Sequence, residues 1–151
     1  MIQMDAITAL LVDDNPTFLR IAAWLLEEHA CGSLVVRAAD GVADTLAHVR
    51  AVRPQVLILG LSLSSQEALG AIPSLRASMP AVGIVALGLL DTPNYQDAVL
   101  EAGADAFVPK VDLNTSLLPA IWQVRRTAQR RSPYVFARHS TLDGTSDKIG
   151  G

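Results

Sequence analysis

The sequence predicts an α/β fold in which helices cover both faces of a five-stranded parallel sheet. The first observation is the run Val-Leu-Ile-Leu at 56–59, which lies between Pro54 and Gly60. Such a run is too short for an independent helix and is typical of a strand buried on both faces. The second is that similar apolar runs recur along the chain, separated by segments with helical periodicity. The third is that 50% of the residues are hydrophobic, enough to form a core.

The predicted strands and helices alternate along the whole chain. The first strand ends at Asp13-Asp14, where Asn15 is a suitable N-cap and Pro16 fits the first turn of a helix. The third helix contains Gly70 and Pro73, so we expect it to be short, bent or begun late. We expect strands at 6–12, 33–38, 54–60, 82–87 and 105–109, and helices at about 16–29, 42–53, 67–79, 95–102 and 114–130.

This alternation predicts a doubly wound sheet of flavodoxin-like order, 2-1-3-4-5, with the second strand shorter and at an edge. Residues 1–131 form the domain, and 132–151 are expected to be a flexible C-terminal tail in which residues 134–136 could dock. The expected inward residues of the first helix are Phe18, Ile21, Ala22, Leu25 and Leu26; those of the last are Leu117, Ile121, Val124 and Ala128.

From the composition we expect a soluble, cytoplasmic chain with no membrane partner and no general attraction to nucleic acid. The net charge of −3 gives no general attraction to anionic partners. No apolar run reaches the ~20 residues of a membrane span, and the N-terminus lacks the pattern of a signal peptide. The single cysteine, Cys31, suits a reducing compartment, and we expect it to be buried.

Five residues stand just past predicted strand ends. In an open α/β sheet, ligands bind at the carboxyl ends of the strands. That edge would carry Asp13, Asp14, Gly60, Gly88 and Lys110. The crevice should lie between the first and third strands, which makes it the candidate site.

Two of these segments resemble the receiver domain of two-component response regulators. The segments are Leu-Val-Asp-Asp-Asn at 11–15 and Ala-Gly-Ala-Asp-Ala-Phe-Val-Pro-Lys at 102–110, and the resemblance covers about residues 6–131. It implies that Asp13 and Asp14 match an acidic pair that holds Mg²⁺, and that Lys110 matches a lysine that pairs with a phosphoryl group. A phospho-accepting aspartate would end the third strand, and a Ser or Thr would end the fourth.

The chain departs from the family at both of the latter positions. Gly60 stands where the phosphorylated aspartate is expected, and Gly88 stands where the Ser or Thr is expected, while Phe107 fits the position of the switch aromatic. Without a carboxylate at 60 there is no nucleophile to accept a phosphoryl group. The resemblance therefore implies a degenerate, phosphorylation-independent receiver (a pseudo-receiver) that is not an enzyme and has no cofactor.

The retained residues allow structural and ligand-binding interpretations. Asp13 and Asp14 could stabilise a helix N-terminus, with Lys110 neutralising one of them, or could weakly bind residual Mg²⁺. The two glycines could also leave space for a small anion beside Lys110.

The last helix carries two candidate interaction features. Tyr95, Leu118, Trp122 and Arg125 are a candidate interface for a protein partner or a second copy, since an aromatic beside Leu and Arg suits such a surface. Four arginines, at 125, 126, 130 and 131, either complement the helix C-terminus or bind a partner or nucleic acid.

Three functions remain open at this point. The first is a signalling module that acts by protein–protein interaction. The second is the regulatory domain of a DNA-binding response regulator whose output domain lies beyond residue 151. The third, a small flavodoxin-like enzyme, is disfavoured because an acidic loop, not a Gly-rich one, follows the first strand.

Overall fold

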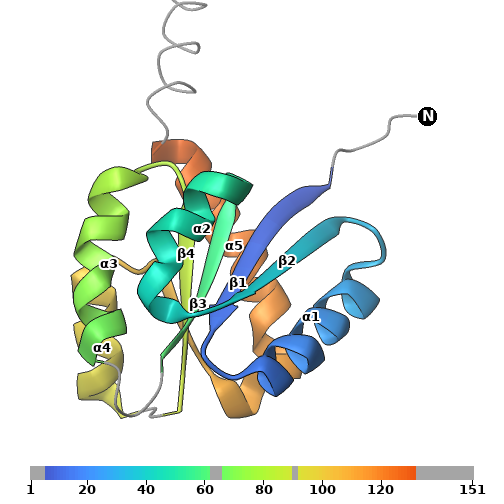
Figure 1. The fold of residues 1–151 in the computed structure, drawn as a ribbon, viewed down its shortest axis with the longest axis horizontal. Helices are drawn as coiled ribbons and strands as arrows, with labels where there is room; N and C mark the ends of the chain where they lie inside the picture. Colours follow the sequence, from blue (N-terminus) through green and yellow to red (C-terminus); the bar gives the residue numbers. More distant parts are fainter. Residues whose placement is uncertain (1–5, 62–65, 90–91, 132–151) are drawn as a thin grey trace, which may run out of the picture.

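A computed structural model describes residues 6–61, 66–89 and 92–131 of the chain. Within them, five strands form one parallel sheet in the order β2-β1-β3-β4-β5, which confirms the predicted architecture (Figure 1). The strands are β1 (Ile7–Asp13), β2 (Leu34–Asp40), β3 (Val56–Leu61), β4 (Gly83–Gly88) and β5 (Ala106–Pro109). The helices are α1 (Pro16–Ala30), α2 (Thr45–Val52), α3 (Gln66–Ser78), α4 (Pro93–Ala102) and α5 (Leu113–Arg131).

The helices cover the sheet from both sides, so the core has two layers. α1 and α5 pack on one face, and α2, α3 and α4 pack on the other (Figure 1). All residues of β3 and β4 are buried, as expected for central strands covered on both faces. The predicted inward residues of α5, Leu117, Ile121, Val124 and Ala128, are also buried.

Strand register brings the candidate residues to one edge of the sheet. Asp13 lies beside Asp40, and Leu61 lies beside Gly88. Gly88 in turn lies beside Pro109, which directly precedes Lys110. We call this end of the sheet the carboxyl edge.

Two helices differ from the expectation. α3 runs unbroken for 13 residues through Gly70 and Pro73, so the expectation of a short or late helix is wrong. Ile72 and Leu75 are buried against the sheet, and this packing outweighs the local cost of proline and glycine. α4 begins at Pro93, two residues before the predicted start, because Thr92 caps it by accepting a hydrogen bond from the Tyr95 amide.

Three smaller expectations also need correction. Ile21 is 52% exposed, because the buried face of α1 is centred on Leu19, Ala22 and Leu26. Cys31 is exposed, because it forms the left-handed C-cap that turns α1 toward β2. β2 lies at an edge as predicted, but its seven residues equal those of β1.

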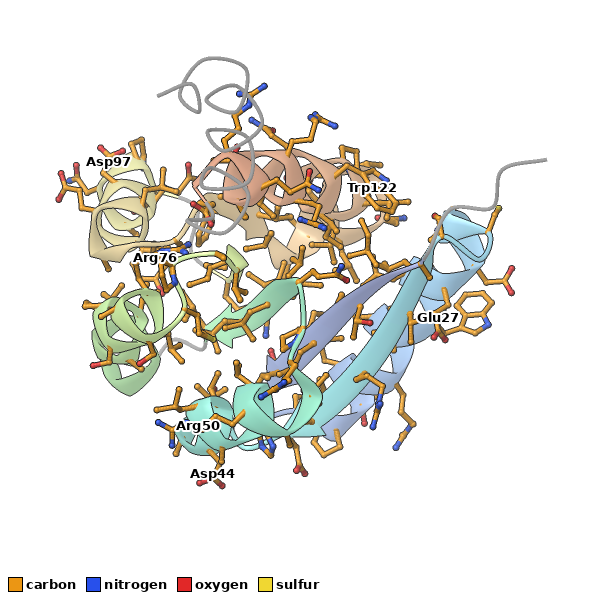
Figure 2. The ribbon with its side chains drawn as sticks, turned by 90° about the horizontal axis from the view of Figure 1, so that it is seen from above. Glu27, Asp44, Arg50, Arg76, Asp97 and Trp122 are labelled. Carbon is orange, nitrogen blue, oxygen red and sulfur yellow. The ribbon has the colours of Figure 1, made fainter. Side chains whose placement is uncertain are left out.

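The opposite end of the sheet, which we call the amino edge, is held by Arg76 on α3. Its guanidinium forms a 2.6 Å ion pair with Asp105. It also donates to the carbonyls of Gly103, Met79 and Val82. The same Asp105 carboxylate accepts the amide of Ile84 at 2.8 Å. One side chain thus joins α3, β4 and the loop before β5; Figure 2 shows Arg76 between α3 and α4.

The predicted tail, 132–151, lies outside the described residues, as do residues 62–65 of the loop after β3. Among the helices that are described, none is long and apolar enough to cross a membrane.

Candidate functional site at the carboxyl edge

The centre of the site is an ion pair between Asp13, at the end of β1, and Lys110, directly after β5. Lys110 Nζ lies 2.7 Å from Asp13 Oδ2, and only 14% of the lysine side chain and 6% of the aspartate side chain are exposed. The other face of the ammonium lies 4.4 Å from the centroid of the Phe18 ring on α1, a cation–π contact. Asp13 Oδ1 accepts the amide of Asn15 at 2.9 Å. Both charges are therefore compensated inside the protein.

Gly60 has no side chain, and the Asp13 carboxylate takes up the space beside it. A Cβ atom built on Gly60 would lie 1.9 Å from Asp13 Oδ2 and 2.7 Å from Asp13 Cγ. Both distances are far below van der Waals contact, so the Asp13 conformation seen here requires glycine at 60. The space expected to be free for an anion beside Lys110 is filled by this carboxylate.

Gly88 shows the same arrangement: a neighbouring side chain fills the space that a side chain at position 88 would take. A Cβ atom built there would lie 2.7 Å from Phe107 Cζ and 2.8 Å from Phe107 Cε2. The Phe107 ring packs edge-on against Tyr95, with 5.9 Å between ring centroids. Burial in this cluster raises the pKa of the Tyr95 phenol above its ordinary value. The inward position of Phe107 therefore depends on glycine at 88.

The Asp14 side chain binds a backbone amide rather than another side chain. Its side chain is exposed, and Oδ1 accepts the amide of Val42 at 2.8 Å, which fixes the turn after β2. Asn15 caps α1 as predicted, with Oδ1 accepting the amides of Thr17 and Phe18. The acidic pair is thus divided between an ion pair and a turn.

The donor set does not fit the Mg²⁺ ion of the family site. Mg²⁺ requires several oxygen ligands in near-octahedral geometry. Here the Asp13 oxygens bind Lys110 and an amide, Asp14 binds an amide, and Gly60 offers no carboxylate. Among the described residues, no three His, Cys, Asp or Glu side chains come together as a metal site.

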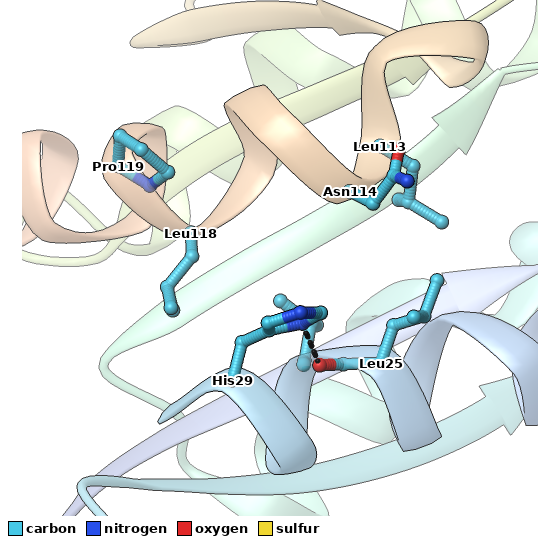
Figure 3. Close-up of a pocket in the computed structure, with 7 residues that line it drawn as sticks. Leu25, His29, Leu113, Asn114, Leu118 and Pro119 are labelled. Carbon is cyan, nitrogen blue, oxygen red and sulfur yellow. Dashed lines mark hydrogen bonds between the residues drawn. The ribbon is translucent and has the colours of Figure 1, made fainter. Parts of the chain in front are cut away.

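The candidate interface residues on α4 and α5 pack on opposite faces of the sheet. Tyr95 packs with Phe107 on the face covered by α2, α3 and α4, whereas Leu118 and Trp122 pack with the core on the α1 face. Leu118 lines a cavity of about 300 Å³ between α5 and α1, opposite Leu25 and His29 (Figure 3). Tyr95 therefore packs on the opposite face of the sheet from Leu118 and Trp122, and their use as an interface stays a prediction.

The arginines of α5 also differ in their environments. Arg125 is half-buried, while Arg126 and Arg130 are exposed. The side chain of Arg131 lies outside the described part. A helix C-terminus is the location where such cations are stabilised by the backbone carbonyls.

Sequence reasoning missed three residues that shape these edges. Phe18 was assigned to the core alone, yet its ring also contacts the Lys110 ammonium. Arg76 and Asp105 were given no role, although they form the amino-edge pair. The available signal was a lone arginine near the end of α3 and an aspartate directly before a strand.

Comparisons with known proteins agree with this architecture. Residues 9–121 match the model of the response regulator receiver domain family. A probable transcriptional regulatory protein of Mycobacterium tuberculosis, TcrX, is 30% identical over 104 residues, covering 69% of this chain and 43% of that protein. A nitrate/nitrite response regulator homologue of Haemophilus influenzae is 28% identical over 125 residues, covering 83% and 58%. The chain spans about half the length of these curated relatives.

Solved structures show the same fold. A CheY-like receiver domain protein from Methanospirillum hungatei superimposes with a TM-score of 0.71 at 19% identity, covering 85% of this chain and 100% of that one. The RcsB response regulator of Salmonella typhimurium gives 0.70 at 20% identity, covering 89% and 67%. Because the family model covers most of the chain, the protein belongs to the response regulator receiver domain family, whose members are two-component signalling modules.

Proposed function

We propose that this receiver domain signals without being phosphorylated, through contacts of its surface with a protein partner. The observation that carries the proposal is the Asp13 carboxylate, which fills the space beside Gly60 and is held there by Lys110. An aspartyl phosphate needs a carboxylate at the end of β3, and residue 60 supplies none. We infer that the chain is a pseudo-receiver with no enzymatic reaction and no bound Mg²⁺ of its own.

The second half of the proposal concerns the conformation of the domain. A phosphorylation switch needs an element with two arrangements whose balance the phosphoryl group shifts. Phe107 packs where a residue-88 side chain would stand, and Tyr95 lies against it. We infer that this cluster keeps one arrangement, so partner binding is governed by the concentrations of the partners.

A second candidate function is favoured by the relatives. Both curated relatives are longer than this chain, and both carry names of regulatory proteins. On this alternative the domain is the regulatory part of a longer DNA-binding response regulator. The length of the complete gene decides between the two, and the proposed lack of phosphorylation applies to either.

Exposure to phosphodonors tests the proposal. The full chain is incubated with acetyl phosphate and Mg²⁺ and analysed by intact-mass spectrometry, beside a receiver that has an acceptor aspartate. We expect no added phosphoryl mass on this chain, and no change in its amide NMR spectrum with beryllofluoride and Mg²⁺. A stoichiometric, base-labile acyl phosphate on the chain would overturn the proposal.

A further inference from the structure

The outer side of α1 presents three residues along one line of the helix. Arg20, Trp24 and Glu27 follow one another at spacings of four and three, so they lie on the same face. All three are exposed, and Trp24 is 61% exposed. We call these residues the α1 stripe. Figure 2 shows its member Glu27 beside β2, on the other side of the molecule from Asp97 of α4.

The α1 stripe borders an open groove of about 700 Å³ along the outer edge of the sheet. β2 is the last strand on this side of the described sheet, so its outer edge pairs with no further strand there. The lining of the groove includes three alanines, which leave room next to Trp24, as well as Asp40 of β2 and His48 of α2. An exposed tryptophan beside a groove has the composition of an interface anchor and its pocket. The small lining residues are Ala23, Ala38 and Ala39.

The charges of the stripe have no ion-pair partner among the described residues. Neither Arg20 nor Glu27 is in one of the ion pairs formed by the described residues. They are seven residues apart, which is about 10 Å along a helix, so they cannot pair with each other. Glu27 instead accepts a long hydrogen bond, 3.4 Å, from the Val36 amide of β2.

The order of the stripe is self-complementary. It reads positive, aromatic, negative, with the tryptophan close to the midpoint of the two charges. A twofold axis near Trp24 reverses the direction of the helix in a second copy. Arg20 of one protomer then faces Glu27 of its partner, Glu27 faces Arg20, and each indole lies near the axis against the groove of the partner. A twofold interface of this kind uses the same surface patch on both subunits.

We propose that the α1 stripe and the β2 groove form a homodimer interface, in which Trp24 of each protomer packs into the groove of its partner. The lining of this groove includes neither Tyr95 nor Trp122, which the sequence favours as interface residues. The proposed interface rests on the proposed function, because both hold that the domain acts through its surface. It adds that the partner is a second copy of the chain.

Charge reversal on the full chain tests the proposed pairing by sedimentation velocity. Arg20→Glu puts two acidic groups opposite each other at both pairs, and Glu27→Arg puts two basic groups there. We expect each variant alone to weaken the dimer by at least about tenfold, since like charges across an interface repel. A mixture of the two variants restores opposite charges at both pairs, so the mixture should dimerise as the wild type does. The double variant Arg20→Glu/Glu27→Arg should also dimerise.

The matched control is Glu28→Arg. Glu28 is the next residue of α1, is also exposed, and points about 100° away from Glu27 around the helix. This variant should dimerise like the wild type. Trp24→Ala should also give monomers while keeping the wild-type melting temperature, because the indole is mostly exposed and contributes little to the core.

A wild-type chain that stays monomeric up to about millimolar concentration would overturn the inference, since about 1 mM marks a very weak complex. Failure of the mixed variants to associate would overturn it as well. Neither result bears on phosphorylation: intact-mass spectrometry of the same samples with acetyl phosphate tests the proposed function separately.

Discussion

The two edges of the sheet are each closed by a partly buried ion pair, and the surroundings of the pairs differ. At the amino edge, Arg76 and Asp105 are 2.6 Å apart; at the carboxyl edge, Lys110 and Asp13 are 2.7 Å apart. Each pair joins elements that are distant in sequence. Arg76 binds backbone carbonyls as well, whereas Lys110 is held by the Asp13 carboxylate and the ring of Phe18.

This difference distinguishes the amino-edge pair, which has a structural role, from the carboxyl-edge pair, which belongs to the candidate site. Backbone carbonyls at the ends of strands are fixed, so the Arg76 network stabilises one arrangement of the amino edge. At the carboxyl edge, Gly60 leaves room for the Asp13 carboxylate of the ion pair, and Gly88 leaves room for the Phe107 ring. Side chains can rotate, so the carboxyl edge should respond to changes in its glycines as well as in its charges.

The largest expected effect is at the amino edge. Arg76→Met should lower the free energy of unfolding by about 3–5 kcal/mol, because it leaves the Asp105 carboxylate partly buried without its ion pair and removes donors from several carbonyls. Urea denaturation measures this loss. The exposed Arg126→Met should change stability by no more than about 0.5 kcal/mol. If Arg76→Met lowered the free energy of unfolding no more than Arg126→Met does, the Arg76 network would contribute nothing to stability.

Lys110→Met should cost somewhat less, about 3 kcal/mol, since it leaves one buried carboxylate unpaired while Asp13 keeps its bond to the Asn15 amide. The double variant Asp13→Asn/Lys110→Met removes both charges and should recover part of the loss in the same urea experiment. A double variant as unstable as the sum of the two single variants would contradict the pairing.

Gly60→Ala should lower the free energy of unfolding by about 1–3 kcal/mol, because the added methyl group forces Asp13 out of its position. A double-mutant cycle with Asp13→Ala measures the coupling between the two positions. Once the carboxylate is gone the methyl group has room, so the combined loss should be smaller than the sum. Strict additivity would show that Asp13 does not occupy this space.

Gly88→Ala should cost about 1–2 kcal/mol by pushing the Phe107 ring away from Tyr95. NMR contacts between the two rings should weaken in this variant. Gly70 is the matched control, because it lies in α3 with nothing within 4 Å of an added Cβ atom. Gly70→Ala should stabilise the fold by up to about 1 kcal/mol. Intact ring contacts in Gly88→Ala would contradict the close packing.

The smallest effect concerns the Tyr95 phenol, whose pKa is raised above 10.0 by burial. Burial favours the neutral form, so this contribution to stability is present below about pH 10 and is lost as pH rises through the folded-state pKa. Unfolding measured from about pH 8 to pH 11 in a Tyr134→Phe background should show the loss, and Tyr95→Phe should reduce it. An identical decline in both chains would argue against burial of Tyr95.

Much of the fold could be predicted because strand ends and helix caps are local signals. Apolar runs ending in Asp13, Gly60 and Gly88 place those residues at one edge once the strand order is known. Asn15 and Pro16 mark the start of α1 in the same local way. The resemblance to the receiver family rests on the segments at 11–15 and 102–110, and the family model, which matches residues 9–121, confirms it.

The structural details that could not be predicted depend on side-chain rotation and on tertiary packing. Nothing local in Val-Asp-Asp-Asn says that Asp13 turns toward Gly60 while Asp14 turns toward Val42. Pro73 lowers the helix propensity of α3, yet the buried residues around it keep the helix whole. The separation of Leu118 from Tyr95 could have been found from helical spacing together with the strand order.

The central claim is that the Asp13 carboxylate, held by Lys110, stands in the space beside Gly60 and leaves no acceptor at the carboxyl edge. A crystal structure of the full chain soaked with beryllofluoride and Mg²⁺ tests it most directly. We expect Asp13 Oδ2 within hydrogen-bonding distance of Lys110 Nζ, and no beryllofluoride or metal density at that edge. Asp13 turned away from Lys110, with Mg²⁺ bound by Asp13 and Asp14, would contradict the account.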